Sequence, residues 1–102
     1  MMNELLNWLQ QQKGSLRTYV EFQDRALALR ADAPEQAALL RLLADLTGRF
    51  VEAYDRQPLS AEIAARALDQ LTEFLGKAVG GRTAGPADQL ALLNQIGASE
   101  LA

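Results

Sequence analysis

The stretch LLRLLADLTGRFVEAYDRQ, residues 39–57, decides the fold of this protein. Its apolar residues recur every three or four positions, and on a helical wheel they cover an arc about 200° wide. They are Leu39, Leu40, Leu42, Leu43, Leu46, Phe50, Val51 and Tyr54. A helix at the edge of a small monomer needs an apolar stripe of only about 100° or somewhat more. We therefore expect a helix here that has several neighbours.

The opposite side of this helix carries charges. Asp45 and Arg49 are four residues apart, as are Glu52 and Arg56, and the acid comes first in each pair. This spacing predicts two ion pairs, each stabilising the helix by about 0.2–0.5 kcal/mol. Exposed pairs of this kind are common and usually inert, so we interpret the four charges as a solvated face rather than a site.

Gly48 lies inside this charged face, where glycine costs about 1 kcal/mol relative to alanine. A kink in the helix, or the close approach of another chain, would explain a glycine at this position. The alternative is that residues 46–49, LTGR, divide the segment into two shorter helices. The sequence leaves these explanations open.

Two helices are expected before this segment. Asn3 has the side chain of an N-cap for a helix over residues 4–13, which Gly14 would end. Ser15 would cap the next helix, which runs to about residue 31. That helix must stop there because the residue before a proline is pushed out of the helical conformation, and Pro34 follows.

The third helix is expected from about Pro34 to Arg56. Asp32 and Glu35 have the spacing of a capping box at its start, and proline is tolerated in a first helical turn. Ser60 would cap a fourth helix that runs to about Val79.

The chain between residues 80 and 86 predicts a flexible linker, because it combines glycines with Pro86. A short last helix is expected over residues 87–97. Its Leu90, Leu93 and Ile96 lie on one side and should dock, either onto the same chain or onto another one.

The composition also favours helices. Of the 102 residues, 49% are hydrophobic and 6% are aromatic, and alanine and leucine dominate. A chain of this length forms one domain and buries roughly 65% of its unfolded surface. We predict an all-α fold, a small bundle of four to five helices with antiparallel neighbours that forms a dimer. Residues 1–79 would be the helical core, 80–86 the flexible linker, and 87–102 a docking helix and tail.

Several kinds of chemistry have no support in the composition. The chain has no Cys and no His, which removes disulfides, thiolate nucleophiles, Cys/His zinc sites and the commonest general base. The net charge of −3 gives no bulk attraction to nucleic acid or to anionic lipid. The longest apolar runs fall far short of the roughly 20 residues of a membrane span, and the first residues do not read as a signal peptide. We expect a cytoplasmic protein without cofactor or metal.

The second helix contains two polar residues in an unusual place. Gln23 and Arg30 fall near the middle of an apolar arc about 180° wide. Polar groups buried without partners cost several kcal/mol, so these two must be paired, snorkelling or facing an interface. Arg30 would snorkel at the helix end while Gln23 bonds a loop carbonyl. Alternatively, both lie in a seam between two chains, where a polar residue can set the register.

We place an interface between chains on the second and third helices, because one neighbour does not cover the apolar arc of either. A second copy related by a two-fold axis would cover both. The predicted interface residues are Tyr19, Phe22, Gln23, Leu29, Arg30, Leu42, Leu46 and Phe50.

Three functions are considered possible from the sequence pattern, and they differ in the partner that they require. The first is a protein–protein interaction module, an adaptor, regulator or chaperone-like protein that acts as a homodimer or on a protein partner, because its apolar helix surface exceeds what one chain can cover. The second is a DNA-binding regulator, because residues 58–79 begin like the first helix of a helix-turn-helix and residues 79–85 resemble a wing. No turn follows residues 64–68, and this helix offers few cations.

The third hypothesis is a small enzyme that uses carboxylates. Glu52 and Asp55 are one helical turn apart and would serve as acid and base if a pocket shifted their pKa values. No nucleophile, phosphate-binding loop or metal motif accompanies them. We therefore predict an interaction protein, not an enzyme, with no catalytic, cofactor-binding or metal-binding residues.

Overall fold

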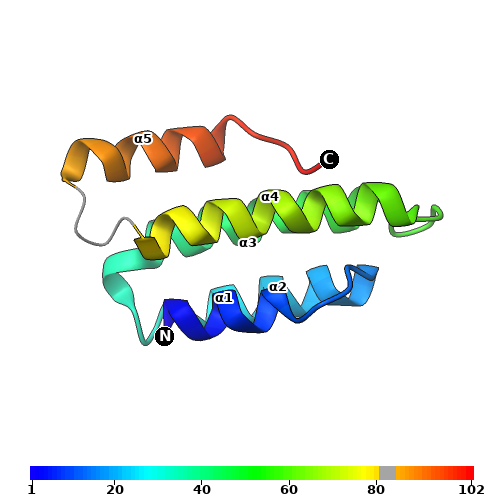
Figure 1. The fold of residues 1–102 in the computed structure, drawn as a ribbon, viewed down its shortest axis with the longest axis horizontal. Coiled ribbons are helices and arrows are strands. Elements are labelled where there is room, and N and C mark those ends of the chain that lie inside the picture. The colour runs from blue at the N-terminus through cyan, green and yellow to red at the C-terminus, as the bar shows by residue number, and fades with distance from the viewer. Residues whose placement is uncertain (81–84) are drawn as a thin grey trace.

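The computed structural model describes residues 1–80 and 85–102. Within them the chain forms five α-helices and one short 3₁₀ turn, η1, with no strand, which confirms the all-α prediction. The elements are α1 (Met2–Gln10), α2 (Leu16–Leu29), η1 (Pro34–Gln36), α3 (Ala37–Ala53), α4 (Ala61–Gly80) and α5 (Pro86–Gly97). Figure 1 shows three layers: α1 with α2, then α3 with α4, then α5 alone.

The helices α2 and α4 begin directly after the predicted cap residues, Ser15 and Ser60. The Ser15 hydroxyl accepts a hydrogen bond from the backbone N–H of Thr18 at 3.4 Å. The Ser60 hydroxyl accepts one from the N–H of Ile63 at 3.1 Å. These bonds satisfy donors that a helix start leaves unpaired, so both serines act as N-caps.

Gly14 ends the first hairpin turn with a φ of +78°, a left-handed conformation that favours glycine. The space is also restricted there. A β-carbon at this position would lie 3.3 Å from both the Tyr19 hydroxyl and the Ala64 carbonyl oxygen. The positive φ therefore favours glycine, and the tight space adds a second cost for any side chain.

Several predicted boundaries are wrong. The first helix covers Met2–Gln10 rather than residues 4–13, so Asn3 lies inside it and is not its cap. Ala33 takes the cap position of η1 without a side-chain hydrogen bond, so the capping box of Asp32 and Glu35 does not form. The third helix ends at Ala53, three residues earlier than predicted. The fourth and fifth helices match their predicted ranges to within one residue at either end.

The core is centred on α3, which buries seven of its 17 residues. Its neighbours are α2 on one side, α5 on the other, and η1 at its start. The expectation that this helix has several neighbours is therefore confirmed, and all of these neighbours belong to the same chain. The largest fully buried side chains are Leu9, Tyr19, Phe22, Leu40, Leu43, Leu46, Thr47, Leu71, Leu75 and Ile96.

Tyr19 connects three helices. Its ring packs edge-on against Phe50 of α3 with 4.9 Å between centroids. Its hydroxyl donates a buried hydrogen bond to the Ala64 carbonyl near the start of α4. Burial raises the pKa of the Tyr19 hydroxyl to about 12, because the phenolate would lose its hydration there.

Gly48 does not divide the third helix, since α3 is continuous through it. Of the alternatives that the sequence left open, the division into two shorter helices is therefore excluded. The Gln23 side chain of α2 lies against Gly48, where a β-carbon would come within 2.6 Å of the Gln23 amide nitrogen. The close approach that the glycine permits is thus made by a helix of the same chain.

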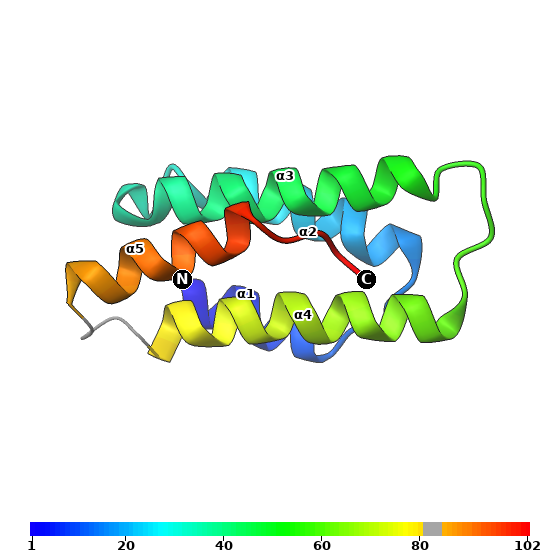
Figure 2. The ribbon, with the colours of Figure 1, turned by 90° about the horizontal axis from the view of Figure 1, so that it is seen from above.

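The last helix docks onto its own chain, against α3 and α4. Figure 2 shows α3 and α4 running in opposite directions, with α5 and the tail lying over the space between them. Ile96 is buried and Leu93 is half-buried, but Leu90 is 58% exposed, so its predicted docking role is wrong. On a helical wheel Leu90 lies about 120° from Ile96, whereas Leu93 lies about 60° from it.

The predicted linker, residues 80–86, falls mostly on residues 81–84, which lie outside the described part of the chain. Of its flanks, Gly80 is the last residue of α4, and Pro86 occupies the first turn of α5. Proline suits that position because its missing N–H would have been unpaired there.

Candidate functional site

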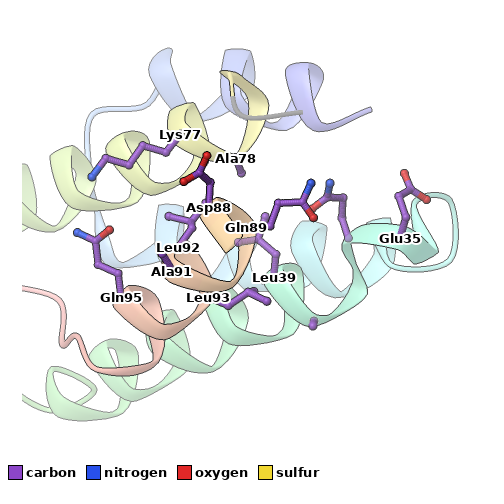
Figure 3. A pocket seen from close by; sticks show the side chains of 12 residues that line it. Glu35, Leu39, Lys77, Ala78, Asp88, Gln89, Ala91, Leu92, Leu93 and Gln95 are labelled. Atoms are coloured by element: carbon purple, nitrogen blue, oxygen red, sulfur yellow. The ribbon is translucent and has the colours of Figure 1, made fainter. Parts of the chain in front are cut away.

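A crevice of about 280 Å³ lies between the start of α3, the end of α4 and α5 (Figure 3). Apolar side chains contributed by all three helices form part of its lining. They are Ala38, Leu39, Ala78, Ala91, Leu92 and Leu93. Leu39 and Ala78 belong to the buried core, while Leu92 and Leu93 are half-buried on α5.

Three of the lining residues have short side chains. Ala38, Ala78 and Ala91 contribute one methyl group each, so they leave space between α5 and the two helices beside it. Further along α5, Ile96 is buried and closes the contact. The C-terminal half of α5 is therefore anchored, while its N-terminal half borders the crevice.

The rest of the lining is polar. Its residues are Glu35, Gln36, Lys77, Asp88, Gln89 and Gln95. Figure 3 shows Leu39 and Leu92 in the middle of the crevice, with Glu35 at one end. The Lys77 ammonium is 3.3 Å from a carboxylate oxygen of Glu73, an exposed pair of the kind that contributes little. The amides can donate and accept hydrogen bonds, so the lining suits an apolar group with a polar margin.

A second, smaller crevice of about 220 Å³ lies between the start of α1 and the end of α2. Arg25 on its edge is already engaged. Its guanidinium lies over the Trp8 ring at 4.4 Å and bonds Glu21 at 3.0 Å. This crevice is smaller, and its arginine already contacts Trp8 and Glu21, so the α3–α4–α5 crevice is the stronger candidate.

Four of the predicted interface residues lie in the chain's own core. Tyr19, Phe22, Leu46 and Phe50 are each at most 4% exposed. The expectation that a second chain is needed to cover them is wrong, because helices of the same chain cover them. The apolar arc measures how much surface must be covered and carries no information about which chain covers it.

The other four predicted interface residues, Gln23, Leu29, Arg30 and Leu42, are half-buried. Arg30 donates from Nε to the Leu27 carbonyl at 3.1 Å, in the last turn of its own helix. This contact agrees with the interpretation of Arg30 as a side chain that snorkels at the end of its helix. Gln23 lies against Gly48, as described above.

The charged face of α3 is exposed, as predicted, but its ion pairs differ from those expected. Asp45 pairs with Arg41 at 3.2 Å instead of Arg49. Arg49 pairs with Glu100 of the tail at 3.3 Å. Arg56 lies beyond the end of α3, so the helical spacing from Glu52 does not apply. A pair 51 residues apart in the chain has no local signal in the sequence.

The other sequence motifs are not part of either crevice. Glu52 and Asp55 are exposed and line neither crevice. α4 is a continuous helix from Ala61 to Gly80, so the turn that a helix-turn-helix needs is missing within it. The proposed wing, residues 79–85, falls largely on residues outside the described part of the chain.

Within residues 1–80 and 85–102, no group of three or more acidic side chains is placed to hold a metal ion. None of the helices in these ranges combines the length and apolar character required to cross a bilayer. Comparison with known proteins gave no match among family models, curated proteins or solved structures.

The sequence reasoning did not find this crevice. Its lining comes from η1 and three α-helices, and Leu92, in its middle, was not among the predicted docking residues. The available signal was the pair Leu92 and Ile96, which are four residues apart and so share one face of α5.

Proposed function

We propose that this protein is a small helical protein–protein interaction module, an adaptor, regulator or chaperone-like protein that binds another protein chain at the α3–α4–α5 crevice. The proposal includes an antiparallel bundle as the scaffold, homodimer formation and a cytoplasmic location. It includes no catalytic activity.

One observation carries the proposal: α5 is anchored at one end and leaves an apolar-floored crevice at the other. A volume of about 280 Å³ is just below the roughly 300–1,000 Å³ of pockets for drug-sized ligands. This size favours one or two apolar side chains of a partner over a large cofactor. Gln36 and Gln89 on the margin supply hydrogen bonds for polar groups beside those side chains.

DNA is a weaker candidate partner. The two cations described on α4 are already next to carboxylates, Arg66 at 3.3 Å from Glu62 and Lys77 at 3.3 Å from Glu73. A recognition helix needs basic side chains that reach the phosphates and bases. The geometry therefore favours a protein partner.

Site-specific photo-crosslinking in cells tests the proposal. A photoreactive amino acid replaces Gln89, which lines the crevice, and in a matched control it replaces Glu62, which is exposed at the other end of α4. We expect a discrete protein adduct from position 89 and none from position 62. The substitution Leu92→Arg should abolish the adduct while the circular dichroism spectrum stays helical.

The mass of the adduct distinguishes a second copy of the chain from another protein. Equal adducts from positions 89 and 62, or none from position 89, would contradict the crevice as an interaction site. A wild-type monomer at high micromolar concentration in sedimentation equilibrium would contradict the homodimer.

A further inference from the structure

Residues 85–102, here called the C-terminal segment, cover a surface made by α3 and α4. We call this the docking surface and define it by Leu39 and Arg49 of α3 and Gln70 and Ala78 of α4. The segment meets it at the crevice, through Ile96, and through the tail. The chain itself therefore shows which kind of helix this surface accepts.

The tail is held by specific polar contacts. The Gln70 amide donates to the Glu100 carbonyl at 3.2 Å and accepts from the backbone N–H of Ala102. The Arg49 guanidinium is 3.3 Å from the Glu100 carboxylate, so the charges on the two sides are complementary. Leu101 between these contacts is only 8% exposed. Together they fix the direction and register of the segment.

Of the five α-helices, α5 nevertheless buries the smallest share of its residues. It buries one of 12, Ile96, whereas α4 buries six of 20. Elements with few buried apolar contacts open at a lower free energy than the core. The docking surface therefore becomes free more readily than any surface inside the α1–α4 core.

We infer that the docking surface takes up the C-terminal segment of a second copy of this chain. A second copy carries the identical segment, so Ile96, Glu100 and Leu101 from another chain meet the same partners that they meet in their own. Exchange of an identical element keeps these contacts, which makes it a low-cost route to a dimer. This inference rests on the homodimer of the proposed function and names the segment through which two copies associate.

A labelled synthetic peptide of residues 85–102 serves as the probe, and fluorescence anisotropy measures its binding to full-length protein. In the wild type the chain's own segment competes with the peptide. The variant Ile96→Ser weakens that competitor and leaves the docking surface unchanged. Because apparent affinity rises with the fraction of free surface, we expect the variant to bind the peptide at least about tenfold more tightly than the wild type.

Two controls make the result specific. A peptide that itself carries Ile96→Ser should bind neither protein, and Gln70→Ala added to the Ile96→Ser chain should weaken binding of the normal peptide severalfold. Circular dichroism and thermal unfolding check that each variant is folded. If Ile96→Ser does not fold, Leu101→Ser, outside every helix, replaces it with the same expected direction.

The inference is refuted if a folded variant binds the peptide no more tightly than the wild type. If position 89 then also forms an adduct with a different protein, the proposed interaction module is supported. Exchange of segments between two copies is contradicted. Peptide binding without any adduct from position 89 would support the exchange of segments and contradict the crevice as a site for other partners.

Discussion

The side chain of Gln23 on α2 occupies the space that a β-carbon at Gly48 on α3 would need, with 2.6 Å between that carbon and the Gln23 amide nitrogen. The glycine thus has a packing explanation inside one chain. The atom that approaches is the end of a flexible, half-buried side chain, so it can move at small cost.

This contact predicts a coupling between positions 23 and 48. Alanine in a helix interior is favoured over glycine by about 1 kcal/mol, but in the wild type Gly48→Ala must also displace Gln23. We expect Gly48→Ala to stabilise the Gln23→Ala background by about 1 kcal/mol and the wild type by less. Urea unfolding of the four proteins in a double-mutant cycle measures this. Equal effects in both backgrounds would show that the two side chains do not interact.

Tyr19 predicts a loss of stability at alkaline pH. Its pKa is about 10 in the unfolded chain and about 12 in the fold, so the unfolded state loses its proton first. The contribution of Tyr19 is complete below pH 10 and declines as the pH rises towards 12, by about 2–3 kcal/mol in total. Chemical unfolding between pH 8 and about 12 tests this. Tyr19→Phe is the control, and its stability should fall less over the same range; parallel curves would contradict the assignment.

Tyr19→Phe also removes the hydrogen bond to the Ala64 carbonyl. Near neutral pH we expect a loss of about 1 kcal/mol, because one buried hydrogen bond is lost while the Ala64 carbonyl keeps its helical bond within α4. Tyr54→Phe is a matched control, since Tyr54 is half-buried and its ring is tilted against Phe50 with 5.1 Å between the centroids. Thermal and urea unfolding of both variants give the comparison, and an equal loss for the two would contradict the special role of the Tyr19 hydroxyl.

Leu90 and Ile96 should differ sharply although both are apolar residues of α5. Leu90 is 58% exposed and Ile96 is 1% exposed. We expect Leu90→Ala to change the free energy of unfolding by less than about 0.5 kcal/mol and Ile96→Ala to lower it, or that of local opening of α5, by about 2–4 kcal/mol. Hydrogen exchange of the α5 amides separates local from global effects. Similar costs at both positions would mean that Leu90 is covered in solution.

The tail contact at Gln70 should be detectable locally. Gln70→Ala removes the two hydrogen bonds to residues 100 and 102, so amide exchange in α5 and the tail should become faster, by roughly fivefold for each 1 kcal/mol lost. The neighbouring residue Asp69 is exposed, and Asp69→Ala should leave these amides unchanged. If amide exchange became equally faster in α2 and α3, the Gln70 hydrogen bonds would not act only on α5 and the tail.

Short-range signals in the sequence were sufficient to place most of the helices. The serine caps at residues 15 and 60, the left-handed Gly14 and the 3.6-residue apolar period act within about four residues, so the sequence alone determined them. The start of α1 did not follow such a signal. Asn3 has the side chain of an N-cap, but α1 begins one residue before it, and Met1 at the cap position makes no side-chain hydrogen bond.

Only the tertiary structure decided which elements cover the apolar face of each helix. The wide arcs of α2 and α3 correctly predicted that much area must be buried, but α5 and the other helices of the same chain cover Tyr19, Phe22, Leu46 and Phe50. A helical wheel records the direction of each side chain and not the distance to its neighbours. For that reason the contact of Gln23 with Gly48, the pair of Arg49 with Glu100 and the crevice beside Leu92 emerge only when helices distant in sequence pack together.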